Sequence, residues 1–264
     1  MQNRSYGNLL TYAEMYSKYE ELARASDNPY FYKLQHKQQY IYCVGVKHTC
    51  NPNDGQFAAL KKLFSEFKSK VESSNALILI EGGVCPRSSS EQKAITQFGE
   101  PGFLVFLADK NALEVVSPEP NDAFILDELK KQFNTESILY SRFTDIACQW
   151  NRLPAKPEFR RYVDKFLRSD KIALGLRAQD FPLEKLIEIH DKTHDHKFDK
   201  DDLKCFHNDS SPHDNKIVQV AEDIRDNYIL NRVVDYIKAG RSLFIVYGSS
   251  HVIRYEKFLK QFTS

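Results

Sequence analysis

Two copies of a Gly-x-x-His phrase lie far apart in the chain, each directly after an apolar run. Gly45-Val46-Lys47-His48 follows the run Tyr40 to Val44, and Gly248-Ser249-Ser250-His251 follows the run Leu243 to Tyr247. Each copy predicts a buried strand that turns on its glycine and delivers a histidine to the carboxyl end of that strand, where open α/β sheets hold their sites. The pair therefore predicts one shared site. The other interpretation is a coincidence of two glycine turns with two surface histidines.

Two glutamates occupy similar positions at the ends of predicted strands. Glu81 follows the apolar run Ala76 to Ile80 and precedes two glycines, and Glu119 follows the run Leu113 to Val116 and lies between two prolines. An unpaired carboxylate is costly to bury. We therefore expect both glutamates at the same sheet edge as the histidines. A simple cap on a backbone turn is the alternative for Glu81.

One arginine lies close to the apolar stripe of a long predicted helix, Lys216 to Ala239. A guanidinium placed like that of Arg225 seeks a carboxylate or a developing oxyanion. The alternative is an ordinary ion pair on the helix.

These residue types allow two mechanisms of water activation. A neutral histidine beside a carboxylate can act as a general base, with the carboxylate fixing its tautomer. His48, His251 and one glutamate also make the two-nitrogen, one-oxygen ligand set of a catalytic zinc-like site. Ser249, Ser250 and Cys50 are further candidate nucleophiles, although the sequence holds no G-x-S-x-G nucleophile elbow.

In their order and context, these motifs resemble the Tiki/TraB superfamily. The motifs are the strand-ended G-x-x-H, the strand-ended Glu-Gly-Gly, the strand-ended Glu, the helix of the form R-x-x-x-x-x-x-R from Arg225, and the terminal G-x-x-H. The wider relatives of that superfamily are the erythromycin esterases, the ChaN haem-binding proteins and the C-terminal domain of Pasteurella toxin. The resemblance runs from about Tyr40 to the end of the chain. It implies one site lined by His48, Glu81, Glu119, Arg225 and His251.

The resemblance implies which residues form the site, but it is compatible with more than one reaction. Tiki members are metal-dependent proteases, which implies a divalent ion (Mn, Co or Zn) on His48, Glu81 and His251, whereas the esterases hydrolyse without metal. We expect hydrolysis of an ester or amide bond in a small-molecule or peptide substrate. The alternatives are a non-catalytic haem or ligand binder of the ChaN type, and a toxin or effector module acting on a host protein.

The elements that must hold this site alternate along the chain as strand, helix, strand, helix, strand. This order predicts a single α/β domain over residues 1–264, with a mainly parallel central sheet flanked by helices. We expect the strands ending at His48, Glu81, Glu119 and His251 to point the same way. From about residue 121 to 190 the sequence predicts only helices, which we interpret as a cap inserted before the last strand.

A polar insert of about residues 190–213 follows the predicted cap. It is rich in histidine and also holds Cys205. His190 and His194 have the i, i+4 spacing that can share a metal on a helix, but no complete zinc spacing appears. We therefore expect a mobile segment with little contact to the core.

Composition limits the remaining function classes. The 264 residues carry 37 Lys and Arg against 36 Asp and Glu, so no global field attracts nucleic acid or an acidic membrane. Five widely spaced cysteines predict reduced thiols in a cytoplasmic protein, or in a secreted effector without a classical signal peptide. No apolar run reaches the length of a membrane span, and the oligomeric state is left open.

Overall fold

The chain divides into two compact units. The computed structural model describes residues 9–25, 29–151, 153, 155–202 and 216–264. The first unit comprises Met1–Glu119 and Asp226–Ser264, and the second comprises Pro120–Arg225. The division falls inside one long helix, α8 (Lys216–Lys238).

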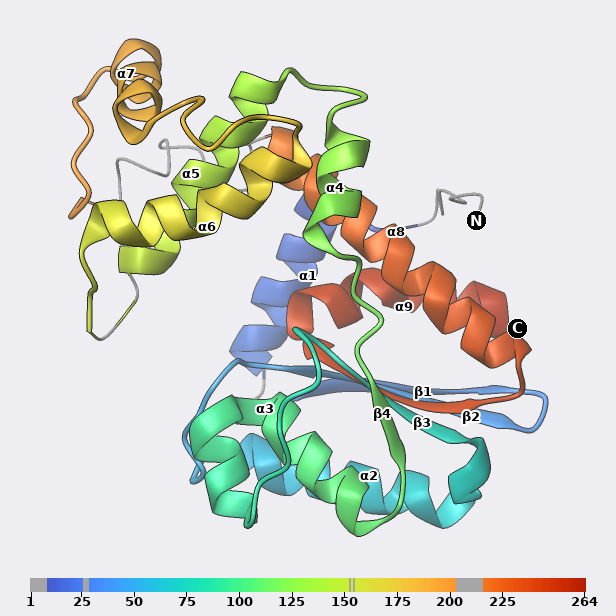
Figure 1. Cartoon of the computed structure of the whole chain (residues 1–264). Helices are drawn as coiled ribbons and strands as arrows, with labels where there is room; N and C mark the ends of the chain where they lie inside the picture. Colours follow the sequence, from blue (N-terminus) through green and yellow to red (C-terminus); the bar gives the residue numbers. More distant parts are fainter. Residues whose placement is uncertain (1–8, 26–28, 152, 154, 203–215) are drawn as a thin grey trace. The chain divides into compact units, whose positions relative to one another are not determined.

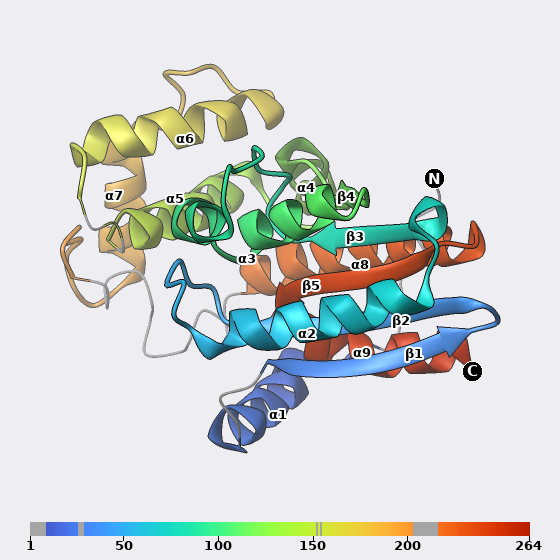
Figure 2. The same ribbon diagram turned by 90° about the horizontal axis from the view of Figure 1, so that it is seen from below.

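The first unit is built on a five-stranded sheet of order β1-β2-β5-β3-β4 (Figures 1 and 2). Its strands are β1 (Tyr30–His36), β2 (Gln39–Val46), β3 (Ala76–Ile80), β4 (Glu114–Val116) and β5 (Ser242–Gly248). β2, β5, β3 and β4 are mutually parallel, and β1 pairs antiparallel with β2. The predicted α/β class is therefore confirmed, as is the common direction of the four strands that precede the predicted site residues.

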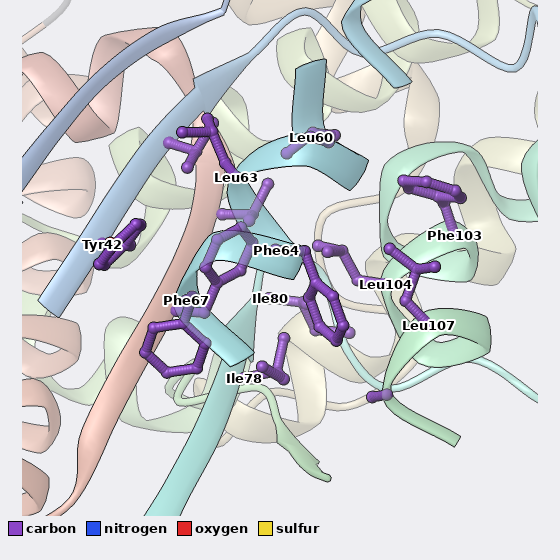
Figure 3. Close-up of a cluster of buried hydrophobic side chains, with 14 of the residues drawn as sticks. Tyr42, Leu60, Leu63, Phe64, Phe67, Ile78, Ile80, Phe103, Leu104 and Leu107 are labelled. Carbon is purple, nitrogen blue, oxygen red and sulfur yellow. The ribbon is translucent and has the colours of Figure 1, made fainter. Parts of the chain in front are cut away.

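Helices cover both faces of this sheet, which explains why its central strands are apolar throughout. α2 (Gly55–Lys70) and α3 (Glu91–Lys110) pack on one face with strand side chains such as Tyr42, Ile78 and Ile80 (Figure 3). The opposite face packs on α9 (Ser249–Thr263) and the C-terminal part of α8, and α1 (Tyr12–Ala25) packs on α9. Every residue of β3 and β5 is buried.

α3 is kinked at Gly99. Gly99 adopts φ 60° inside the helix, and Pro101 follows it. A Cβ on Gly99 would meet the carbonyl oxygen of Thr49 at 2.9 Å, so both the backbone angle and the close approach require glycine there. The kink turns the intervening Glu100 inward, where it is 3% exposed.

The first Gly-x-x-His phrase differs from its prediction. Gly45 is not a turn residue, because β2 continues through it to Val46. A Cβ on Gly45 would meet the Cα of Ser249 at 2.8 Å. This glycine therefore allows the start of α9 to approach the strand, and it does not supply an unusual backbone angle.

The second unit is helical, as its sequence predicts. It contains α4 (Asp122–Leu129), α5 (Thr135–Asn151), α6 (Phe159–Ala173), α7 (Leu183–Thr193) and the first part of α8. These helices share their own apolar core, which includes Ile138, Phe143, Val163 and Leu186.

The prediction of a mobile histidine-rich insert is wrong for its first residues. His190 belongs to α7 and is completely buried, and Phe198 packs on Phe143 with ring centroids 5.4 Å apart. Burial, followed by the neighbouring His194 and His196, lowers the pKa of His190 to about 4, so its ring is neutral at pH 7. The rest of the predicted insert, including Cys205, His207 and His213, lies outside the described residues.

None of the helices in the described ranges has the length and the apolar character that crossing a membrane requires.

Candidate functional site

The two Gly-x-x-His phrases interlock at the carboxyl edge of the sheet. β2 and β5 are neighbours, and Val46 pairs with Gly248 in their parallel register. Gly45 makes room for Ser249 of the other phrase. In turn, a Cβ on Gly248 would meet the Nε2 of His48 at 3.1 Å. Each glycine is therefore required by a residue of the other phrase, and this mutual fit brings the two histidines to one place.

Glu81 lies between the two histidines. Its Oε2 is 3.7 Å from the Nε2 of His48, and its Oε1 is 3.7 Å from the Nε2 of His251. The backbone N–H of Gly248 donates to Oε2 at 2.7 Å, which fixes the carboxylate. Three of the five predicted site residues, His48, Glu81 and His251, therefore converge in the first unit.

A buried carboxylate stands behind each histidine, on the side away from Glu81. The Nδ1 of His48 lies 3.6 Å from the Oε2 of Glu100, and the Nδ1 of His251 lies 2.9 Å from the Oδ1 of Asp226. Both histidines thus direct Nδ1 to a buried acid and Nε2 to the shared Glu81. A carboxylate beside Nδ1 favours the imidazole tautomer with its proton on Nδ1, and the lone pair of Nε2 then stays available.

The kinked helix α3 and the start of α2 hold Glu100 in place. Its Oε1 accepts hydrogen bonds from the backbone N–H of Thr49 at 2.7 Å and from the Nε2 of Gln56 at 3.1 Å. Gln56 is itself buried and bonds both the N–H and the carbonyl of Lys47. This network ties the loop that carries His48 to two helices.

Asp226 is the centre of a second network, formed by one turn of α9. Its Oδ1 faces His251 and accepts a hydrogen bond from the Tyr255 hydroxyl at 2.6 Å, and its Oδ2 accepts one from Arg254. Burial raises the pKa of Asp226, but His251, Arg254 and Tyr255 outweigh burial and hold it below its ordinary value. The side chain of Asp226 is fully buried.

The charge state of His48 follows from its surroundings. The Glu100 carboxylate raises the pKa of His48 above its ordinary value, partial burial opposes this rise, and Glu81 adds to it. The side chain of His48 is 63% exposed, whereas that of His251 is 15% exposed. His48 is thus the histidine that water reaches more freely.

The other two predicted residues lie at the division between the units. Glu119 is half-buried three residues after the end of β4 and is the last residue before the second unit. Arg225 ends the second unit, and its Nη1 lies 3.4 Å from the Oε2 of Glu222 on the preceding turn of α8. Their convergence with His48, Glu81 and His251 stays a prediction.

One acidic and histidine cluster has the spacing of metal ligands. Within the described ranges, Glu222, Asp226 and His251 form the group whose ligand atoms all lie within 4.8 Å of one another. Such a group could bind a metal. The Asp226 oxygens, however, already accept bonds from Tyr255 and Arg254, so a role in orienting His251 suits this carboxylate better than direct ligation.

Sequence reasoning missed the two buried acids. Glu100 lies in Gly99-Glu100-Pro101-Gly102, where the helix-breaking residues draw attention away from the buried carboxylate between them. Asp226 directly follows Arg225, the residue selected on the same helix. The signal that could have found both acids is a carboxylate inside an otherwise buried stretch, because a buried carboxylate needs a partner.

Comparison of the chain with protein-family models, with curated proteins and with solved structures found no match in any of the three.

Proposed function

We propose that the protein is a hydrolase that activates water at His48, Glu81 and His251 to cleave an ester or amide bond. The observation that carries the proposal is the alternation of acids and histidines, Glu100–His48–Glu81–His251–Asp226, with each Nε2 turned to the one central carboxylate. The likeness of the motif order to the Tiki/TraB superfamily supports the same reaction class.

The buried acids hold the histidines ready for proton transfer. Asp226 keeps the His251 ring oriented through its bond to Nδ1, and the Glu100 carboxylate faces the Nδ1 of His48 at 3.6 Å. General acid–base catalysis needs such fixed geometry together with a pKa near the working pH. The exposed His48 would exchange a proton with the substrate or water, and the less exposed His251 would keep its place beside Glu81.

The same three residues fit a divalent metal ion. The 3.7 Å separations from Glu81 are longer than a hydrogen bond and near the roughly 3.4 Å between two ligand atoms of a tetrahedral zinc ion. His48 and His251 would hold a manganese, cobalt or zinc ion through Nε2, and Glu81 would hold it through a carboxylate oxygen. When bound, such an ion lowers the pKa of a coordinated water.

The test is hydrolysis of a panel of generic esters and peptides by the purified full-length chain, after chelation and after addition of Mn²⁺, Co²⁺ or Zn²⁺. His48→Ala and His251→Ala should each lower turnover on the order of a hundredfold or more, because each removes a proton-transfer or ligand group. Recovery of activity on adding one of the ions would assign the metal-dependent mechanism.

The matched control is His36→Ala. His36 is the last residue of the edge strand β1, where it pairs with Gln39 at the start of β2, whereas Gly45 lies at the other end of that pair of strands. Its ring stacks on Phe262. Its loss should leave turnover unchanged. Equal rates for wild type and His48→Ala would overturn the proposal, and haem uptake that depends on His48 would favour the ligand-binding alternative.

A further inference from the structure

The second unit holds a cluster of three histidines that the proposed hydrolase site does not use. His190 lies in the last turn of α7, His194 caps that helix, and His196 lies in the loop that follows. Their ring centroids are 4.2 Å apart for His190–His194, 5.3 Å for His190–His196 and 5.6 Å for His194–His196. Three imidazoles therefore meet at one end of α7.

The innermost ring has a buried nitrogen that lacks a hydrogen bond. The Tyr140 hydroxyl lies 2.9 Å from the Nδ1 of His190. Its Nε2 is shielded from solvent and has no hydrogen-bond partner within the described part of the chain. Leaving such a group unpaired costs about 1–3 kcal/mol, and native structures hold few of them. A ligand at Nε2 would remove this cost.

The second ring is in the tautomer that metal binding requires. The Nδ1 of His194 lies 3.1 Å from the carbonyl oxygen of His190 and 2.8 Å from the Thr193 hydroxyl. Because a carbonyl only accepts, the Nδ1 of His194 carries the proton and its Nε2 keeps a lone pair. Both rings thus direct Nδ1 to oxygen, which is how metal-bound histidines are usually held.

The His196 ring lies near the other two because the loop after α7 is anchored to the core of the second unit. The Oδ1 of Asp191 accepts a hydrogen bond from the backbone N–H of Phe198 at 2.8 Å, which closes the loop onto the end of α7. The Phe198 ring packs on Phe143 and Phe159. His196, between these anchors, has an exposed side chain that can rotate.

We propose that His190, His194 and His196 bind one divalent ion of the zinc, copper or nickel type. Imidazole ligands without a carboxylate favour these ions over magnesium or calcium. With metal–nitrogen distances of about 2.0–2.1 Å, three rings on a tetrahedral ion have centroids roughly 5 Å apart, close to those described above. The ligand nitrogens of these three described residues do not all lie within 4.8 Å of one another, so binding includes rotation of the exposed His196 ring.

The experiment measures Zn²⁺ binding by calorimetry, and Co²⁺ binding by its visible absorption. The protein is the full-length chain carrying His48→Ala and His251→Ala, which removes the site in the first unit. This chain should bind one equivalent of ion. Adding His194→Ala or His196→Ala should weaken that binding at least tenfold, and Tyr140→Phe should weaken it about 10- to 100-fold, because it removes the bond that orients His190.

The matched control replaces two other histidines, with His207→Ala and His213→Ala in the same background. Binding that persists in this control supports the assigned cluster. Binding lost in the control, binding unchanged by His194→Ala and His196→Ala together, or no ion bound at all would each overturn the proposal. Because these variants leave the first unit unchanged relative to their background, the outcome is independent of the hydrolase assignment.

Discussion

Gly248 carries a constraint that its backbone angles do not reveal. Its φ of −50° is open to any residue, so the position does not need glycine for conformation. The need comes from the site, because a Cβ there would lie 3.1 Å from the Nε2 of His48 and 3.4 Å from the Oε2 of Glu81. A single methyl group at this position would occupy the space that the proposed chemistry uses.

Gly248→Ala should therefore lower hydrolysis by roughly ten- to a hundredfold, since displacing reacting groups by about an ångström has effects of this size. The thermal midpoint should change little, because the backbone conformation suits alanine. Turnover and thermal unfolding of the purified variant are the two measurements.

Gly55→Ala is the control for the glycine substitution. Gly55 is the first residue of α2, and a Cβ there would meet nothing within 4 Å. This variant should keep full turnover and gain about 0.4–1 kcal/mol in the free energy of unfolding. Undiminished turnover in Gly248→Ala would show that the space beside His48 and Glu81 has no catalytic role.

At the scale of elements, α9 makes charged contacts on two different faces. One face presents His251, Arg254 and Tyr255 to Asp226. Another face presents Glu256, which pairs with Lys18 of α1 and with Lys260. Burial raises the pKa of Glu256, but its bonds to Lys18, Lys260 and Tyr30 outweigh burial and lower the pKa to about 2.

Stability should depend on pH through this glutamate. Because the folded-state pKa of Glu256 lies below its ordinary value of 4.5, its ionised form stabilises the fold above pH 4.5, and this contribution is lost as the pH falls toward 2. Glu256→Gln should cost roughly 1–3 kcal/mol at pH 7, and the difference from wild type should shrink between pH 5 and pH 2. Urea unfolding at a series of pH values measures it, and a constant difference over that range would exclude the ion-pair origin.

The elements differ in how well the sequence predicts them. The strand Ala76 to Ile80 was predictable because five consecutive apolar residues, bounded by polar ones, suit a strand covered on both faces. Gly45 was predicted as a turn residue. The sequence does not show whether a glycine is needed for its own backbone angles or for the close approach of a neighbouring residue. The burial of Asp226 was not predictable, since helical periodicity cannot show that Arg254 and Tyr255 contact it from another helix. The pairing of Glu100 with His48 needs the loop after β2 to meet the kink of α3, and it has no local sequence signal.

On the scale of the whole molecule, each unit has a core of its own. The first unit has apolar clusters on the two faces of its sheet, and the second has a cluster among its helices. Units with separate cores can open separately, and native-state hydrogen exchange detects such partial unfolding.

Phe143→Ala should therefore weaken hydrogen-exchange protection in α5 and α6 more than in β3 and β5. Phe143 is completely buried in the second unit, and its truncation should cost about 3–5 kcal/mol. Phe244→Ala is the matched substitution in the first unit and should give the opposite pattern. Equal loss of protection in both units, from either substitution, would show that the two cores unfold as one.

The central place of β5 in the sheet has a consequence for folding during translation. β2 and β3 are translated early, but the strand that separates them in the sheet arrives only with Ser242–Gly248. Until β5 has been synthesised, β2 and β3 each have an unpaired backbone edge. Such edges can pair with the wrong strand or with another chain, which leads to aggregation. The nascent chain should therefore depend on chaperones throughout this interval. The proposed site, whose two histidines follow β2 and β5, should become complete only after β5 and the start of α9 have been synthesised.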